Sequence, residues 1–181
     1  MSKRLSLIIL FFCLTAAATP VFAQFSLRAD LLRWATLTPD IGVEWHAGQR
    51  VSVLAHGTWT SWSWNDKGRR YALWEVKPEV RMYFGRDNRC YLGLYGQYGD
   101  FNYKFNVTGH LGTVKGGGIK GGYLFRLNKA LSIDLSAGIG VLHADYDKYF
   151  KYDGTRVRLE HGDKNYWGPT HLGVTLVWNI F

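Results

Sequence analysis

The residues with the clearest chemical potential form a charged row with a spacing of two. In the segment LWEVKPEVRMYF, the charged side chains are Glu75, Lys77, Glu79 and Arg81, and the positions between them are apolar. Successive side chains of a strand point to opposite faces, so carboxylates and cations share one face here. This spacing predicts ion pairing on a strand whose other face is oily. Pro78 lies on that oily face, where we expect a missing backbone hydrogen bond or a bulge.

The histidines form no recognisable catalytic or metal-binding motif. They are His46, His56, His110, His143, His161 and His171. No pair has the i, i+4 helix spacing or the Cys/His clustering of zinc sites. His143 and Asp145 could contribute to a hydrolytic set like that of barrels that modify lipid A, which requires a nucleophile beside a histidine and an acid. The last strand reads His171-Leu172-Gly173, without the His-x-Ser pairing of the deacylases. We therefore expect no enzyme, no metal and no cofactor, and keep the lipid A-modifying enzyme as an alternative.

A glycine-rich segment resembles a nucleotide motif only formally. GGGIKGG, residues 116–122, contains G-x-G-x-x-G, but Tyr123-Leu124-Phe125 continues a strand where a dinucleotide fold requires a helix. These glycines are better explained as space for bulky neighbours inside a barrel.

The N-terminus indicates export. Lys3 and Arg4 precede an apolar run, and Val21-Phe22-Ala23 offers small residues at a cleavage site, so residues 1–23 are predicted to be a signal peptide and residues 24–181 the mature barrel. No apolar stretch after the leader approaches twenty residues, and Cys90 is the one cysteine left, so we expect neither a transmembrane helix nor a disulfide. The net charge of +8 is scattered, which suits anionic glycolipid better than nucleic acid.

The elements that must position the charged row are predicted to be strands. Aromatic and β-branched segments separated by turn residues predict eight of them: 25–34, 41–46, 51–62, 71–84, 90–103, 114–125, 130–146 and 166–181. Links after the second, fourth and sixth strands are short, whereas those after the third, fifth and seventh are longer, with a polar loop at 147–165. Such alternation is typical of bacterial outer-membrane barrels. The short first link leaves open whether the first two segments are separate strands.

The faces of these strands indicate an inverted barrel. In the seventh strand, Leu131 to Val141 alternate with serines, glycines and Asp134, so one face is wholly apolar and the other is small or polar. Bulky Trp, Leu and Ile on the apolar faces, and aromatic residues near strand ends, suit a lipid-facing exterior with aromatic girdles. A barrel of eight strands has an interior that side chains can fill. We therefore predict a structural ion-pair network in the lumen, with a gated ion path or small-ligand site as the alternative. Its expected members are Glu44, Glu75, Lys77, Glu79, Arg81, Lys120 and Asp134, with Arg28 and Asp30 as further candidates.

Several stretches together resemble a known family. They are LLRWATLTPDIGVEW, KPEVRMYF, GGYLFRLNKALSIDLSAGIGVLHADYDKY and YWGPTHLGVTLVWNIF, which span nearly all of residues 24–181. In these stretches the chain resembles the domain of unknown function 3575 family of Bacteroidetes outer-membrane proteins. The resemblance implies an outer-membrane barrel, sometimes encoded beside fimbriae, with no assigned activity and no functional residues to transfer.

The sequence thus predicts an all-β, eight-stranded antiparallel up-and-down transmembrane β-barrel with a packed polar lumen, placed in the outer membrane with both termini in the periplasm. We expect a non-enzymatic structural or interaction role, as a subunit or helper of a surface assembly such as fimbriae. The expected partners are outer-membrane lipid and lipopolysaccharide and another surface or outer-membrane protein. A soluble periplasmic lipocalin-like binding barrel is the remaining alternative.

Overall fold

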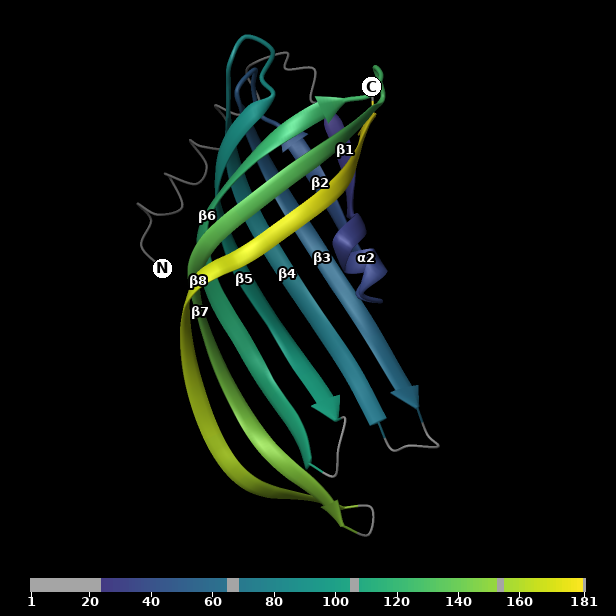
Figure 1. Ribbon diagram of the computed structural model, residues 1–181, viewed down its shortest axis with the longest axis vertical. Coiled ribbons are helices and arrows are strands. Elements are labelled where there is room, and N and C mark those ends of the chain that lie inside the picture. The colour runs from purple at the N-terminus through teal and green to yellow at the C-terminus, as the bar shows by residue number, and fades with distance from the viewer. Residues whose placement is uncertain (1–23, 65–68, 105–107, 153–154, 181) are drawn as a thin grey trace, which may run out of the picture.

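In the described part of the chain, eight antiparallel strands form one closed barrel, each paired with its neighbours in sequence (Figure 1). This computed structural model describes residues 24–64, 69–104, 108–152 and 155–180, so the predicted signal peptide lies outside the described residues. The predicted all-β class and the eight-stranded up-and-down order are confirmed. The elements are β1 (Phe25–Asp30), α2 (Leu31–Ala35), β2 (Asp40–His46), β3 (Val51–Trp64), β4 (Arg69–Phe84), β5 (Cys90–Lys104), β6 (Thr108–Arg126), β7 (Leu131–Tyr152) and β8 (Thr155–Ile180).

The first predicted strand, 25–34, is wrong beyond Asp30, where a single helical turn begins. The Asp30 carboxylate accepts hydrogen bonds from the backbone N–H groups of Leu32 (3.0 Å) and Arg33 (3.4 Å), which is how an N-cap residue starts a helix. The helix α2 then separates β1 from β2, and the two strands pair antiparallel from Phe25↔Trp45 onward. The first two segments are therefore separate strands.

The barrel wall has unequal height around its circumference. β8 pairs with β7 along nearly all its length, but with β1 only over the last six residues of β8, and α2 lies against β8 beyond that point. Figure 1 shows β7 and β8 running past the other strands at the end opposite the C-terminus. Among the described residues, no helix is long and apolar enough to cross a membrane.

The predicted polar loop at 147–165 is wrong, because β7 and β8 continue through most of it as a two-stranded ribbon. Tyr152 pairs with Thr155, so the strands approach to within two residues of each other in sequence. The predicted start of the sixth strand at Val114 is also too late, since β6 begins at Thr108. A ladder needs only backbone partners. The two strands of the ribbon can therefore pair without an apolar face. Their sequence lacks the apolar alternation from which the other strands were predicted.

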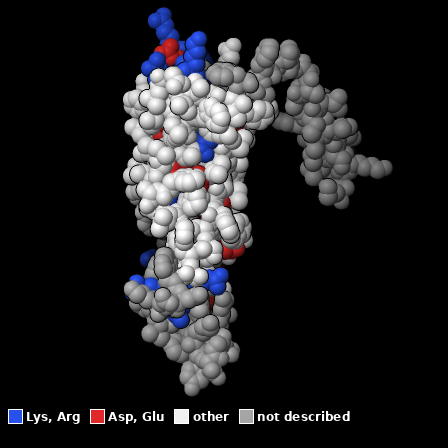
Figure 2. Space-filling view, turned by 90° about the vertical axis from the view of Figure 1, so that its right-hand side faces the viewer, with Lys and Arg blue, Asp and Glu red and all other residues white. Residues whose placement is uncertain are grey.

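Around the barrel, large apolar side chains face outward and polar ones face inward. β4 shows this alternation over its whole second half, from exposed Trp74 to exposed Phe84. The outward apolar residues of neighbouring strands form one apolar belt, which ends away from the short turns at Trp59, Trp74, Tyr98, Val141 and Trp167. Figure 2 shows a largely uncharged band, with Lys and Arg at the end that carries the short turns and again below the band. The surface is thus apolar where a soluble barrel would be polar.

Pro78 interrupts the ladder between β4 and β5. Pairing runs from Val76↔Tyr98 to Glu79↔Tyr95 in one register, and the described ladder has no bridge at the two positions between them. Proline lacks the N–H that such a bridge requires. The predicted loss of a backbone bond is confirmed, and it occurs without the alternative bulge, since the register does not shift.

Candidate functional site

The seven residues predicted for the lumen network all lie in the interior of the barrel. Each is at most 9% exposed, and they come from four different strands: Glu44, Glu75, Lys77, Glu79, Arg81, Lys120 and Asp134. β4 contributes four of them through the period-two spacing, while β2, β6 and β7 place the others opposite. Arg28, on β1, joins the network and is 2% exposed.

Asp134 is the carboxylate on which the network converges. Its Oδ2 atom accepts from the guanidinium groups of Arg28 and, at 3.1 Å, Arg81, and the Tyr91 hydroxyl donates to the same oxygen at 2.9 Å. Asp134 is 0% exposed, so these donors replace the water that the carboxylate loses on burial. The Arg81 guanidinium also lies over the Tyr91 ring, 4.2 Å from its centroid.

Glu44 and Glu79 complete the coordination of the two arginines. Glu44 pairs with Arg28 and accepts from Ser52 Oγ at 2.5 Å and the Tyr83 hydroxyl at 2.6 Å. Glu79 accepts from Arg81 Nε and pairs with Lys120 Nζ, each at 2.5 Å. Each buried charge thus has an opposite charge beside it, the condition under which buried charges are tolerated.

The network continues toward the taller end of the barrel. Glu75 Oε1 lies 2.7 Å from Arg33 Nη2 and 3.0 Å from Lys77 Nζ, so one carboxylate holds two cations. Asp40 accepts from Thr58 Oγ1 at 2.8 Å and lies 2.6 Å from His56 Nδ1. Arg33 reaches the lumen from α2 and was not predicted, because no residue pattern around it indicates that the chain turns inward there.

Glycines on neighbouring strands make room for this network. A Cβ atom on Gly122 would lie 2.5 Å from the Tyr91 ring, and one on Gly93 would lie 2.7 Å from Glu79 Oε1. Both distances are shorter than real Cβ contacts, so these two positions accept only glycine while the ring and the carboxylate keep their places. The glycines of β5 and β6 therefore serve packing, as expected for a narrow barrel.

The lumen network leaves space for about one water molecule. A small gap between Lys77, Lys120 and His171 measures about 10 Å³. Ser136 and His171 approach each other beside this gap, with Oγ and Nε2 3.0 Å apart. Sequence reasoning missed this pair, because its members lie 35 residues apart and meet only through the pairing of β7 with β8. The gap is far too small for a lipid or peptide substrate, so the pair serves the packing of the lumen.

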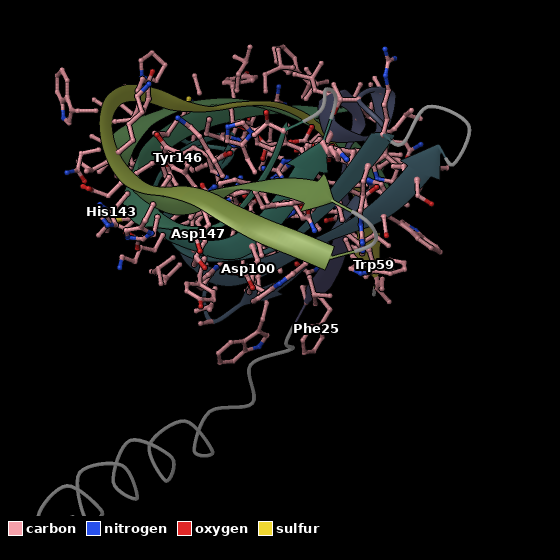
Figure 3. All side chains as sticks on the ribbon, turned by 90° about the horizontal axis from the view of Figure 1, so that it is seen from below. Phe25, Trp59, Asp100, His143, Tyr146 and Asp147 are labelled. Atoms are coloured by element: carbon pink, nitrogen blue, oxygen red, sulfur yellow. The ribbon has the colours of Figure 1, made fainter. Side chains whose placement is uncertain are left out.

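His143 and Asp145 lie beyond the apolar belt and contact each other. His143 Nε2 is 3.0 Å from Asp145 Oδ1, and His143 Nδ1 is 2.6 Å from Asn165 Oδ1. The bond to Asn165 and the nearby carboxylate raise the pKa of His143, and the same imidazole lowers the pKa of Asp145. Figure 3 shows His143, Asp147 and Asp100 at the outer edge of the barrel, viewed from the tall end. The described contacts of His143 include no hydroxyl group that could act as a nucleophile.

Comparison with known proteins places this barrel in a family. The profile described as "Protein of unknown function (DUF3575)" matches residues 6–180. The chain belongs to the DUF3575 family. A search of curated proteins found no match to this DUF3575 protein.

Two solved structures are similar to the DUF3575 protein at low identity. The translocator domain of autotransporter NalP from Neisseria meningitidis is 12% identical, with a TM-score of 0.42; the match covers 90% of this chain and 64% of that one. Outer Membrane Protein W from E. coli, solved by NMR, is 15% identical, with a TM-score of 0.41, over 87% of this chain and 98% of that one. The DUF3575 protein therefore spans less than two thirds of the NalP domain.

Proposed function

We propose that the protein is a non-enzymatic outer-membrane β-barrel with a structural or interaction role. The observation that carries this proposal is the inverted sidedness of the wall. Trp74, Val76, Val80 and Met82 face outward and are 39–52% exposed, whereas the charged residues between them are buried and paired. Exposed apolar side chains in such number are stable only against lipid or a large partner. The closed ladder satisfies the backbone groups that lipid leaves without partners.

The same sidedness argues against the two alternatives. A lipocalin-like barrel would need an apolar interior with room for a ligand, and this lumen holds ion pairs around a gap of about 10 Å³. A lipid A-modifying enzyme would need a nucleophile beside a histidine at the rim. The described partners of His143 are an amide and a carboxylate, a pairing that supports a rim contact and no hydrolytic role.

The long strands supply the surface for an interaction role. A transmembrane strand needs about 9–11 residues, whereas β7 has 22 and β8 has 26. The excess forms a polar ribbon that projects beyond the apolar belt. The ribbon would contact another surface protein, and the family resemblance implies a fimbrial assembly as the kind of partner.

Membrane placement is tested by fractionation. We expect the protein to stay in the outer-membrane fraction after a carbonate wash and to change its mobility on a gel after boiling. Recovery in the soluble periplasmic fraction would contradict the placement. Mass spectrometry of lipid A from cells with and without the protein tests the enzyme alternative, and we expect identical lipid A masses. A mass change that depends on His143 would overturn the non-enzymatic role.

The interaction role is tested by mild-detergent pulldown with a shortened ribbon. Asp147 pairs with His161, so an Asn-Gly turn in place of residues 148–160 preserves the register of the strands below. We expect surface proteins recovered with the full-length chain to be lost with the shortened chain, while its boiling-dependent gel shift stays unchanged. Equal recovery by both chains would show that the ribbon is not the docking surface.

A further inference from the structure

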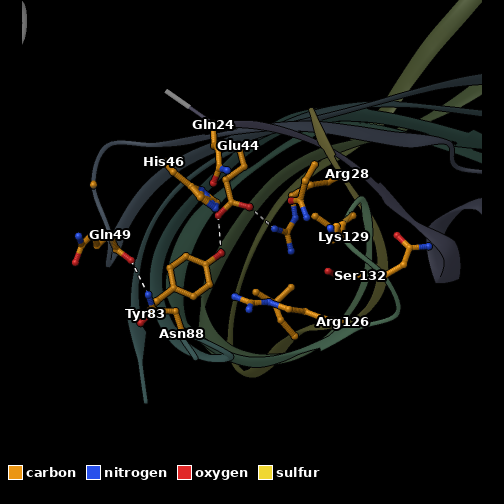
Figure 4. A pocket seen from close by; sticks show the side chains of 15 residues that line it. Gln24, Arg28, Glu44, His46, Gln49, Tyr83, Asn88, Arg126, Lys129 and Ser132 are labelled. Carbon is orange, nitrogen blue, oxygen red and sulfur yellow. Dashed lines mark hydrogen bonds and ion pairs between the residues drawn. The ribbon is translucent and has the colours of Figure 1, made fainter. Parts of the chain in front are cut away.

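The end of the barrel with the short turns holds a large open cup. This mouth cup has a volume of about 1120 Å³ and is lined by Arg28, Glu44, His46, Tyr83, Arg126 and Lys129, together with several amide side chains (Figure 4). It is slightly larger than the roughly 300–1,000 Å³ typical of small-molecule binding sites, and it is open to solvent.

Three acceptor groups of the mouth cup are engaged within the protein. Glu44 accepts from Arg28, Ser52 and Tyr83. The Asn128 carbonyl oxygen accepts from the backbone N–H groups of Ala130 (2.8 Å) and Leu131 (2.7 Å). The Asn179 carbonyl oxygen accepts from Ser26 Oγ at 2.8 Å. The side-chain oxygens of Glu44, Asn128 and Asn179 are therefore already occupied.

Several hydrogen-bond donors of the mouth cup have no acceptor within the described part of the protein. Within the described residues, Lys129 Nζ and the amide nitrogens of Asn128 and Asn179 have no protein acceptor, and Arg126 donates to a single backbone carbonyl, that of Asp87. Arg28 Nε, on a side chain only 2% exposed, is buried without a partner in the same part of the barrel. In this cup Glu44 is neutralised by Arg28, whereas Arg126 and Lys129 face no carboxylate of the described structure and several donors are free, so the cup is complementary to a ligand that carries acceptor oxygens and negative charge.

The rim around the mouth cup is positively charged, like Arg126 and Lys129 in the cup itself. Arg50, Arg86 and Arg89 are exposed on the neighbouring short turns, and Asp87 is the one described acid among these turns. Figure 2 shows charged side chains, mostly Lys and Arg, at the top end of the molecule. Such a rim attracts anions toward the cup by long-range electrostatics.

We propose that the mouth cup binds an oxyanion, the carboxylate or phosphate group of a polar ligand on the side of the short turns. Arg126 and Lys129 provide the charge, and the free amide nitrogens of Asn128 and Asn179 provide directed hydrogen bonds. Arg28 is neutralised by Glu44 and Asp134 and contributes only its Nε atom. The site is separate from the ribbon at the opposite end of the barrel, so it goes beyond the interaction role proposed above.

Isothermal titration calorimetry of the folded full chain in a neutral detergent tests this proposal. The probes are inorganic phosphate and a tri-glutamate peptide, with a tri-lysine peptide as the negative control. The test variant is the double substitution Arg126→Gln with Lys129→Gln, which removes both charges at exposed turn positions. The matched control is Arg86→Gln with Arg89→Gln, which removes the same charge from the rim outside the cup. The boiling-dependent gel shift verifies folding of each variant.

We expect at least one of the two anionic probes to bind, and the cup variant to bind it at least about tenfold more weakly, because hydrogen bonds to charged groups are being removed. The rim control should lose no more than about twofold, through weaker steering. Preference for phosphate or for the peptide would identify the source of the oxyanion. Equal losses in both variants would overturn the site in favour of general charge attraction, and so would the absence of binding by both anions. Neither failure would affect the membrane placement, which is measured by fractionation.

Discussion

At the scale of single residues, Asp134 shows how the lumen tolerates charge. One carboxylate from β7 meets guanidinium groups from β1 and β4 and a hydroxyl from β5, so four strands are joined through one side chain. Such a group stabilises the fold only while all its partners are present, because each partner would otherwise be a buried charge without a counterion.

We predict that Asp134→Asn destabilises the barrel by about 3–5 kcal/mol, since it leaves Arg28 and Arg81 with one fewer carboxylate while preserving the shape of the side chain. The measurement is urea unfolding of the protein in lipid vesicles. Asp87→Asn is the matched control, because its pair with Arg89 (3.3 Å) lies on an exposed turn. Exposed pairs contribute about 0–1 kcal/mol. Similar losses for both substitutions would contradict a network that depends on buried charge.

The pH response of His143 is predicted from its two acceptors. An imidazolium donates from both ring nitrogens, which suits Asn165 Oδ1 and Asp145 Oδ1 together, so the protonated form is favoured and the pKa of His143 is raised. A raised folded pKa means that this pairing is complete at low pH and is lost as pH rises through that pKa. NMR titration of the ring should give a midpoint above 6.5.

Asn165→Ala should lower the titration midpoint of His143, because the bond to Asn165 is the largest cause of the shift. The removed carbonyl oxygen leaves Nδ1 without its acceptor. A midpoint unchanged by this substitution would show that the ring does not donate to Asn165 in solution.

Residue-level prediction from the sequence worked where strand periodicity applied. Period two is sufficient to put Glu75, Lys77, Glu79 and Arg81 on one face, and the structure has all four side chains inside the barrel. Arg33 and Ser136 show the limit. Arg33 depends on the direction in which α2 leaves the wall, and the contact of Ser136 with His171 depends on the register between two strands. Neither quantity is encoded in local alternation.

At the scale of elements, β4 is a continuous strand in which one position, Pro78, lacks pairing with β5. Pro78 remains opposite Ala55 of β3, whereas its side toward β5 is unpaired. The outward position of Pro78 lets its ring cover Gly96, since its Cγ atom lies 3.7 Å from where a Cβ of that glycine would be. The wall thus stays covered where the ladder is open.

We predict that Pro78→Val slows amide hydrogen exchange at Gly96 and Gln97, because valine restores the missing N–H and suits an apolar strand position. The measurement is exchange followed by NMR in micelles, with the amides of Leu92 and Leu94 as internal references in the intact part of the ladder. Exchange at Gly96 that is equal in both proteins would mean that proline is not the cause of the open position.

The extended ribbon shows why strand ends were harder to predict than strands. The segment that follows Tyr146 contains Tyr149, Phe150 and Tyr152, which favour strands. The dipeptide Asp-Gly at positions 153 and 154 is a sequence typical of two-residue hairpin turns, so it favours a hairpin over an open loop. Charged residues lie between these aromatics, so the segment lacks the apolar alternation by which the other strands were predicted. A ribbon beyond the apolar belt needs no apolar face.

At the scale of the whole molecule, the sequence determined the sidedness of the barrel but not its height. The apolar faces of β2, β4, β7 and β8 all point outward, as their alternation predicts. At roughly 3.3 Å per residue, β7 is about 70 Å long, more than twice the hydrocarbon thickness of a bilayer. The barrel therefore divides into an apolar half that fits a membrane and a polar half that extends from it.

The closure of the wall also determines when the barrel can be completed during folding. Ser26 of β1 donates to Asn179 of β8 across a sequence separation of 153 residues, and this is the seam that joins the two ends of the sheet. The seam cannot form until the last strand of the chain is available, and bringing such distant segments together is slow. Until the seam closes, β1 and β8 each present an open edge able to pair with another chain. Closure of this barrel thus awaits its final strand, and a chain that stops before Thr175 would retain an unsealed sheet.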